Sequence, residues 1–531
     1  MVPKILLTTA IGPFSNMDGA SVNDIHASRM THGQGIFTQR SYYPALPLYI
    51  LAQNISASSA VLENPTPEFF EQEVRNNYEY IGITFPPIFL DKVHAMCQTI
   101  RRISPRTKII LGGYGVFCIE EDVGIGKKIK PLVDHICRGE GVRFLRGILG
   151  EPLDRPITED LPLNQTFLMD QPAAKLFNLA SSLGCNNDCE FCSTSAFFGH
   201  KKTYLMTPEQ LLWQIKKNAA SGRAISTWIY DEDFFDPPEY SRELARIMKA
   251  DREIPKHLIN LGTLGSVKSL SKFRVEEFLE MGINHIWVGV ESKFSALPKR
   301  QGRDIRELFA SFHSAGIMTI ASFIIGLDCQ TPENIEEDIE FFASLNPTFT
   351  QITGILPCPG TKLWQNLDLE KRLSDFEQLS WDDYHMYTPL FQPKHFSKKE
   401  LLPLIKKAYS NSYEKSGPSI LRALEIHLNG FENCIASENS IIKQRVAYYE
   451  TICRQIYPVL LAIREFSPST EVSQKVDLLR QRMKKHFGKP DLKSRLSSIL
   501  ALFGGGILSI RPKRFERNIH PVNLKRVFPP K

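Results

Sequence analysis

The sequence has no long apolar run and no recognisable export signal. Its best candidate for a membrane span, residues 496–510, is short and interrupted by Gly504, Gly505 and Gly506, whereas a span needs roughly 18 consecutive apolar residues. The first residues lack the small-residue cleavage site of a secretory signal. We therefore expect a cytoplasmic protein with no transmembrane segment, in which the ten cysteines stay mostly reduced.

The chain also has little excess of charge of either sign. Its 64 Lys and Arg residues exceed its 58 Asp and Glu residues by only six, which does not indicate nucleic acid as a partner. Basic residues do gather between Arg511 and Lys531, where we expect a solvated tail. Hydrophobic residues (42%) and charged residues (23%) lie near globular averages, which excludes a disordered chain.

A length of 531 residues is too great for one ordinary hydrophobic core and predicts two or three domains. In residues 1–150, short apolar β-rich runs alternate with helical patterns, which is typical of a doubly wound, Rossmann-like parallel sheet. The expected strands there are residues 4–9, 58–62, 80–85, 108–113 and 133–138. Prolines mark residues 151–171, where we expect a linker.

A second alternating series in residues 172–365 predicts a partial (β/α)6 barrel, with chemistry at the carboxyl ends of its strands. The expected strands are residues 177–182, 227–230, 257–261, 285–290, 319–325 and 350–356. In residues 366–531 the strand signals fade, and helical periodicity predicts a mainly helical domain that covers the barrel mouth. The predicted fold class is thus α/β, with a helical C-terminal domain.

Three cysteines lie close together directly after the first strand of the second series. Cys185, Cys189 and Cys192 fall within eight residues, so their thiolates can hold three corners of a four-iron, four-sulfur (4Fe-4S) cluster. The fourth iron would then have no protein ligand, and a chelating substrate could occupy it. Polar Asn186, Asn187 and Asp188 between the cysteines disfavour simple core packing. A zinc site with His200 as fourth ligand is the stronger alternative, although its spacing from Cys192 exceeds that of zinc fingers.

This spacing at the end of a first barrel strand resembles the radical S-adenosylmethionine (SAM) superfamily, as does the aromatic residue before the last cysteine. The resemblance implies that Cys185, Cys189 and Cys192 bind a 4Fe-4S cluster and that SAM binds its open iron. The residues that it implies near SAM follow in chain order: Phe191, Asp231 and Glu232 (amino group), Glu291 and Ser292 (ribose), Gly326 (methionine end) and Pro357 (adenine loop).

The glycines of the first domain resemble the cobalamin-binding domain found before the barrel in one branch of that superfamily. Gly112 and Gly113 end one expected strand, and Gly139, Glu140 and Gly141 follow the next, where backbone can approach a ligand closely. One feature departs from the pattern. The stretch from Asp24 through His26 to Arg29 has Arg29 where domains with a histidine below the cobalt carry glycine, so it gives no lower ligand.

The resemblance implies reductive cleavage of SAM to a 5′-deoxyadenosyl radical. With cobalamin bound, the favoured reaction is methyl transfer to an unactivated carbon or a phosphinate. Two alternatives stay open: a radical mutase, cyclase or oxidative enzyme without methyl transfer, and a non-catalytic zinc-binding scaffold. The expected partners are a small-molecule or lipid-like substrate and a flavodoxin, ferredoxin or reductase as electron donor.

Overall fold

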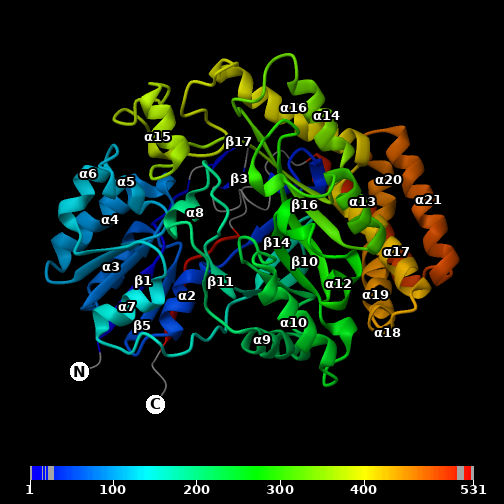
Figure 1. Cartoon of the computed structure of the whole chain (residues 1–531), viewed down its shortest axis with the longest axis horizontal. Coiled ribbons are helices and arrows are strands. Elements are labelled where there is room, and N and C mark those ends of the chain that lie inside the picture. Colours follow the sequence, from blue (N-terminus) through cyan, green and yellow to red (C-terminus); the bar gives the residue numbers. More distant parts are fainter. Residues whose placement is uncertain (1–2, 15, 18–19, 22–28, 511–518, 528–531) are drawn as a thin grey trace.

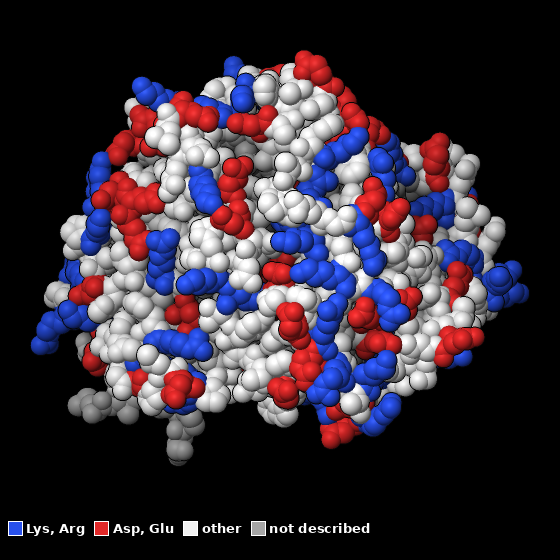
Figure 2. Space-filling view, in the orientation of Figure 1, with Lys and Arg blue, Asp and Glu red and all other residues white. Residues whose placement is uncertain are grey.

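The computed structural model describes residues 3–14, 16–17, 20–21, 29–510 and 519–527. Two sheets with their helices form most of the molecule, and a group of helices lies at the end farther from the first sheet (Figure 1). Figure 2 shows basic and acidic side chains mixed over the face in view, in keeping with the small net charge. No helix of the described ranges is long and apolar enough to cross a membrane.

The first sheet has five parallel strands in the order β5-β1-β6-β7-β8, with β18 antiparallel at the edge beside β5. Its strands are β1 (Lys4–Thr8), β5 (Ser58–Glu63), β6 (Tyr80–Thr84), β7 (Lys108–Gly112), β8 (His135–Cys137) and β18 (Asn523–Val527). The helices around it are α2 (Leu46–Gln53), α3 (Pro67–Val74), α4 (Leu90–Ile103), α5 (Val116–Glu120), α6 (Gly126–Ile129) and α7 (Gly141–Leu149). The strand order reverses between β1 and β6, which is where doubly wound sheets bind ligands.

The second sheet is a curled half-barrel of six parallel strands, extended by antiparallel β9 and β4. Its strands are β4 (Arg40–Tyr42), β9 (Asn164–Leu168), β10 (Gln171–Leu179), β13 (Ser226–Ile229), β14 (Leu261–Gly265), β15 (Ile283–Glu291), β16 (Met318–Ile325) and β17 (Phe349–Gly354). A small pair, β11 (Ser182–Leu183) and β12 (Thr203–Tyr204), follows β10. Its helices are α8 (Ser193–Phe197), α9 (Pro208–Ser221), α10 (Pro238–Ala250), α11 (Val267–Leu270), α12 (Val275–Glu280), α13 (Ile305–Ala315), α14 (Ile335–Ser344) and α15 (Lys362–Leu369).

The C-terminal helices share one core with the half-barrel. They are α16 (Lys398–Ser416), α17 (Ser419–Ala436), α18 (Ser440–Lys443), α19 (Val446–Ile456), α20 (Leu460–Glu465), α21 (Thr470–Phe487) and α22 (Leu492–Ser509). The hydroxyl of Tyr449 on α19 donates to the carbonyl of Gly316 after α13, at 3.2 Å. Most of these helices pack outside the barrel. Helix α16 reaches the carboxyl end of β16, where a Cβ on Gly326 would lie 3.2 Å from the Leu401 side chain. That the C-terminal helices cover the barrel mouth stays a prediction.

The predicted fold class is confirmed, with three local corrections. The strand expected at residues 257–261 is displaced: residues 256–258 form a 3-10 turn, and β14 begins at Leu261. The sequence of β14, Leu-Gly-Thr-Leu-Gly, gives a weak strand signal because glycine is depleted in strands. Gly262 is needed because a Cβ there would lie 2.2 Å from the Trp228 ring.

The other two corrections concern stretches that we expected to be irregular. Strand β9 lies within the expected linker and pairs with β10. The C-terminal stretch is no solvated tail in its described part, because Lys525 and Arg526 belong to β18. The Arg526 guanidinium lies 3.1 Å from a carboxylate oxygen of Glu73 and donates to the hydroxyl of Tyr78. Residues 511–518 and 528–531 lie outside the described ranges.

Candidate active site

The cysteine loop lies at the carboxyl end of β10, between β11 and α8. Cys185 and Cys189 are buried, and Cys192 is half-buried. The loop starts with Gly184 at φ +80°, where a Cβ would lie 2.1 Å from the carbonyl oxygen of Lys201. Cys192 caps α8, since its sulfur accepts from the backbone N–H of Ser195 at 3.5 Å. The local fold thus holds the three thiols in one loop and shields them from solvent.

The three thiols lie close enough to influence one another. Burial raises the pKa of Cys185 and that of Cys189 to about 11, and the neighbouring Cys192 adds to both shifts. A metal that binds these sulfurs must therefore displace their protons. No three His, Cys, Asp or Glu side chains within the described ranges are grouped as a single metal ion requires.

His200, the candidate fourth zinc ligand, is held by its own loop. Its Nδ1 lies 3.0 Å from a carboxylate oxygen of Asp188 and 3.2 Å from the hydroxyl of Ser195. These contacts fix the orientation of the imidazole within the cysteine loop.

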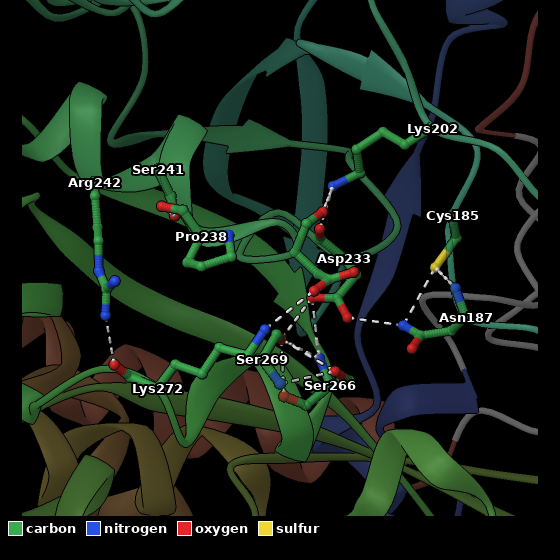
Figure 3. A network of polar contacts seen from close by, with 11 residues as sticks. Cys185, Asn187, Lys202, Asp233, Pro238, Ser241, Arg242, Ser266, Ser269 and Lys272 are labelled. Carbon is green, nitrogen blue, oxygen red and sulfur yellow. Dashed lines mark hydrogen bonds and ion pairs between the residues drawn. The ribbon is translucent and has the colours of Figure 1, made fainter.

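A polar network connects Cys185 to the carboxyl end of β14 (Figure 3). Both the backbone N–H and the side-chain amide of Asn187 donate to the Cys185 sulfur at 3.4 Å. The same amide donates to Asp233 at 2.9 Å, and Asp233 also accepts from the Ser269 hydroxyl at 2.6 Å. Hydrogen bonds of this kind orient a metal ligand and tune its basicity. Sequence reasoning did not assign a role to Asn187 or Asp233, although their position beside the cysteines and the acidic pair was a signal.

The two carboxylates of the predicted acidic pair differ in their surroundings. Asp231 is buried and accepts from the backbone N–H and the hydroxyl of both Ser181 and Ser182, at 2.5–3.1 Å. It therefore holds the end of β10 against β13. Glu232 instead lines a large cavity, and its Oε2 is buried without a hydrogen-bond partner. Burial raises the pKa of Glu232 to about 8. Of the two, Glu232 has the free oxygen with which to bind a ligand.

This difference predicts that amide substitutions at Asp231 and Glu232 have different effects on the stability of the protein. We expect Asp231→Asn to lower the free energy of unfolding by about 3 kcal/mol, because the amide accepts fewer of the four hydrogen bonds. Glu232→Gln should not destabilise the protein, since no bond to Oε2 is lost. Urea unfolding of the two variants beside wild type at pH 7 measures both values. If Glu232→Gln were destabilised and Asp231→Asn were unaffected, Glu232 would be the structural carboxylate and Asp231 the one available to a ligand.

Glu232 also predicts a pH dependence. Between pH 4.5, the ordinary pKa of Glu, and pH 8, the folded protein keeps a proton that the unfolded chain releases. Wild-type stability should therefore fall as pH rises through this window, by at most about 1.4 kcal/mol per unit from this group. Glu232→Gln has no such proton, so its stability advantage should grow from pH 5 to pH 8 and then level off. Measuring the free energy of unfolding of both proteins at several pH values tests this prediction. Burial also raises the pKa of Glu159 to about 8, but Glu159 is present in both proteins, so its contribution cancels in the comparison.

A buried ion pair faces the cysteines from the fourth barrel strand. Glu291 ends β15 at φ +60° and pairs with Lys299, whose ammonium lies 5.4 Å from the centre of the Phe191 ring. Burial opposes the charge of Lys299, but Glu291 and the nearby Cys189 raise its pKa overall. The pair brings Glu291 and Phe191, two predicted SAM residues, to the same side of the cysteine loop.

A second network joins Ser292 to Gly326 across two strand ends. The Ser292 hydroxyl donates to Asp338 at 2.5 Å, and Asp338 accepts from the Gln330 amide at 2.9 Å. The oxygen of that amide accepts from the backbone N–H of Gly326 at 2.8 Å. Asp338 and Gln330 were missed from sequence, since neither matches a motif. They fix the carboxyl ends of β15 and β16 relative to each other.

The sixth-strand loop lies against the cysteine loop. The backbone N–H of Leu363 donates to the carbonyl of Glu190 at 2.9 Å, and the Tyr384 hydroxyl donates to the carbonyl of Pro357 at 2.9 Å. All the predicted cluster and SAM residues thus lie at one end of the half-barrel.

A cavity of about 610 Å³ lies where the strand order of the first sheet reverses. All five predicted cobalamin residues line it, together with residues from the barrel side. They are Gly112, Gly113, Gly139, Glu140 and Gly141 from the first sheet, and Leu183, Phe197, Phe198, Leu205 and Glu232 from the barrel. The hydroxyls of Tyr114 and Thr194 share a hydrogen bond of 2.9 Å, which ties the cavity wall to α8. The cavity therefore extends from the doubly wound sheet to Glu232 and to the residues on either side of the cysteine loop, Leu183 and Phe197.

The C-terminal segment of the described chain forms part of the cavity wall, which was not predicted from the sequence. His520, just before β18, lines the cavity, and Asn523 of β18 donates to Glu63 at 2.9 Å. Strand signals are weak so late in a helical stretch, so nothing in the sequence linked this segment to the first domain. The Asp24–His26 stretch lies outside the described residues. Arg29, which follows it, stacks over the Tyr387 ring at 4.1 Å.

Comparisons with known proteins agree with this arrangement. Residues 179–342 match the Radical SAM superfamily model, so the chain carries a radical SAM domain. It is 23% identical over 388 residues to an uncharacterised methyltransferase of Pyrococcus horikoshii, a match that covers 66% of this chain and 82% of the relative. It is 25% identical to the hopanoid C-2 methylase of Rhodopseudomonas palustris, over 37% of this chain and only 39% of that protein. It is 23% identical to the anaerobic magnesium-protoporphyrin IX monomethyl ester cyclase of Rubrivivax gelatinosus, over 65% of this chain and 68% of the relative.

Two solved structures of the radical SAM methyltransferase TsrM from Kitasatospora setae share the fold. One holds tryptophan substrate and a SAM analogue, and it matches 85% of this chain and 99% of its own with a TM-score of 0.53 and 12% identity. The other holds cobalamin and a [4Fe-4S] cluster, and it matches 70% of this chain and 78% of its own with a TM-score of 0.51 and 13% identity. At such identities the likeness concerns the fold alone.

Proposed function

We propose that this chain, whose residues 179–342 form a radical SAM domain, is a cobalamin-dependent methyltransferase acting on an unactivated carbon or a phosphinate. One observation carries the proposal: a single cavity reaches from the switch point of the first sheet to Glu232 at the barrel mouth. A methyl carrier in the first domain would thereby face the SAM site directly. The methyltransferase names of two relatives and of TsrM support the same reaction class.

The cysteine loop fits a 4Fe-4S cluster. Cys185, Cys189 and Cys192 would hold three irons, and Asn187 would donate hydrogen bonds to the first of these ligands. The turn at Gly184 leaves room for no side chain, so only glycine fits where the cysteine loop begins. The partnerless Oε2 of Glu232 fits an amino group, which supplies the missing donor.

The remaining predicted residues would surround SAM. Glu291 and Ser292 would meet the ribose, Gly326 the methionine end, and Pro357 the adenine, with Phe191 beside the cluster. Asp231 would act by positioning, since its oxygens are already bonded to Ser181 and Ser182. Lys299 would hold the Glu291 carboxylate in place.

The cavity fits cobalamin in kind. Its wall is mostly apolar, and with a volume of about 610 Å³ it would enclose part of so large a cofactor. Gly112, Gly113, Gly139 and Gly141 would allow close approach of the cofactor, and Glu140 caps α7 by accepting from the backbone N–H of Val142 at 2.5 Å. When bound, the cluster and SAM would supply a carbon radical and cobalamin a methyl group; the chain's own tasks are to hold both reactants and exclude water.

The products formed by the reconstituted protein test the proposal. Anaerobic protein loaded with iron, sulfide and cobalamin would be given SAM, a strong reductant and candidate apolar substrates. We expect 5′-deoxyadenosine together with S-adenosylhomocysteine, and the second product should require cobalamin. An electron donor of the flavodoxin or ferredoxin type is the expected natural partner. Failure to form either product with an intact cluster and any substrate tried would count against the proposal.

A second candidate is a radical cyclase or mutase, which the similarity to the Rubrivivax gelatinosus cyclase favours. It would yield 5′-deoxyadenosine without S-adenosylhomocysteine in the same experiment. The ratio of the two products therefore separates the candidates.

A further inference from the structure

Helix α22 exposes its large apolar side chains. Leu500 is 71% exposed, Phe503 is 68% exposed and Ile510, directly after the helix, is 80% exposed. The complete set of exposed apolar side chains along it is Leu492, Leu496, Ile499, Leu500, Phe503, Ile507 and Ile510. We refer to these seven residues as the apolar face. Large apolar residues scattered singly over a surface need no explanation, but seven on one helix do.

The opposite side of α22 packs on the protein through small residues and Leu508, which lies against the core shared with the barrel. Ser498 and Gly505 are its buried residues. A Cβ on Gly505 would lie 2.8 Å from the Phe466 ring and 3.0 Å from the Ile36 side chain. The helix also packs against α20, which lies at the end of the molecule away from the first sheet (Figure 1). An ordinary surface helix buries its large apolar residues, whereas most of the large apolar residues of α22 are exposed.

The geometry of the helix gathers the apolar face into a narrow stripe with cations beside it. At 3.6 residues per turn, the seven residues fall within an arc of about 100°. On the same wheel Lys493 follows one edge of the arc and Arg495 precedes the other. The sequence has no acidic residue from 492 to 515, and Arg511, Lys513 and Arg514 follow the helix. An apolar stripe between cations suits a surface that is both apolar and anionic.

We propose that α22 binds in the plane of an anionic lipid membrane, with the apolar face among the acyl chains and the flanking cations at the headgroups. Because the described chain has no helix able to span a membrane, this contact would lie on the surface. A second copy of this chain would bury the apolar face equally well, but it would bring the basic residues of the two copies together. The anionic membrane satisfies both the apolar face and the cations. This proposal is independent of the reaction at the cysteine site.

Co-sedimentation of the full chain with lipid vesicles tests the proposal. We expect binding to vesicles made of equal parts phosphatidylcholine and phosphatidylglycerol, and much weaker binding to pure phosphatidylcholine. The double variant Leu500→Glu/Phe503→Glu should bind the anionic vesicles at least about tenfold more weakly, because two large side chains no longer enter the lipid. The double variant Trp213→Glu/Leu369→Glu, which changes equally exposed residues on α9 and α15, should bind like wild type.

The charge is tested separately by Lys493→Gln/Arg495→Gln, which should reduce the preference for anionic vesicles while leaving the apolar face intact. Light scattering would detect a second copy as the occupant. Absence of vesicle binding, vesicle binding unaffected by Leu500→Glu/Phe503→Glu, or self-association that this variant abolishes would each overturn the proposal. Since all of the changed side chains are exposed, circular dichroism should show that each variant stays folded.

Discussion

Replacing Cys185, Cys189 and Cys192 together by alanine should abolish both iron-sulfur absorbance and the formation of 5′-deoxyadenosine. The proposed cluster has no other protein ligand, and without its electron the carbon–sulfur bond of SAM does not break. We expect product to fall to background, at least about a thousandfold below wild type, since the whole catalytic effect depends on the cluster. Anaerobic reconstitution followed by absorbance and product analysis gives both readouts.

The control for this experiment is Cys329→Ser. Cys329 is a half-buried thiol beyond the end of β16 that contacts Ser292 but is not one of the proposed cluster ligands, so its replacement should leave the cluster spectrum unchanged. A triple variant that still binds iron and sulfide like wild type would exclude these cysteines as the ligands. A cluster lost in both proteins would mean that general instability explains the result.

The variant Gly112→Trp should prevent cobalamin binding while preserving the cysteine site. Gly112 lines the cavity, and a Cβ there would meet Cys137 only at 3.8 Å, an ordinary contact. The backbone therefore tolerates a side chain, whereas an indole would occupy the space proposed for the cofactor. We expect the retained corrinoid, measured by its visible absorbance after gel filtration, to fall at least about tenfold.

The paired variant Gly112→Ala adds one carbon atom and should retain cobalamin. In Gly112→Trp, S-adenosylhomocysteine should disappear with the corrinoid, while the iron-sulfur absorbance stays. If the two variants bind cobalamin equally well, the cavity is not the cobalamin site. Loss of cobalamin from both would indicate that any addition at Gly112 disturbs the sheet, and Gly141 at the start of α7 would then be the next position to change.

The fold was predictable where the signal was local. Parallel strands followed by helices left a clear pattern, and the cysteine spacing identified the candidate cluster loop. The bounds of β14 were predicted wrongly because its sequence, Leu-Gly-Thr-Leu-Gly, contains two glycines and gives a weak strand signal. Gly262 is required by the nearby Trp228 ring, a contact that exists only in the folded protein. Strands β9 and β18 were missed because each pairs with a partner that the local sequence does not specify.

The candidate site was likewise predictable only in part. Motif position predicted which residues lie at the barrel mouth, but not the difference between Asp231 and Glu232. That difference depends on Ser181 and Ser182, 49 or 50 residues earlier in the chain, which bond one carboxylate and leave the other free. Likewise, Asp338 and Gln330 join two strand ends through contacts that no spacing rule describes.

The pairing of β18 with β5 has a consequence for biosynthesis. His520 lies on the same cavity wall as Thr9 and Asn64, yet it is synthesised more than four hundred residues after them. The wall is therefore incomplete on the ribosome until residues 519–527 have emerged and β18 has added to the sheet edge. A cofactor held by this cavity would be acquired only once residues 519–527 have joined the sheet.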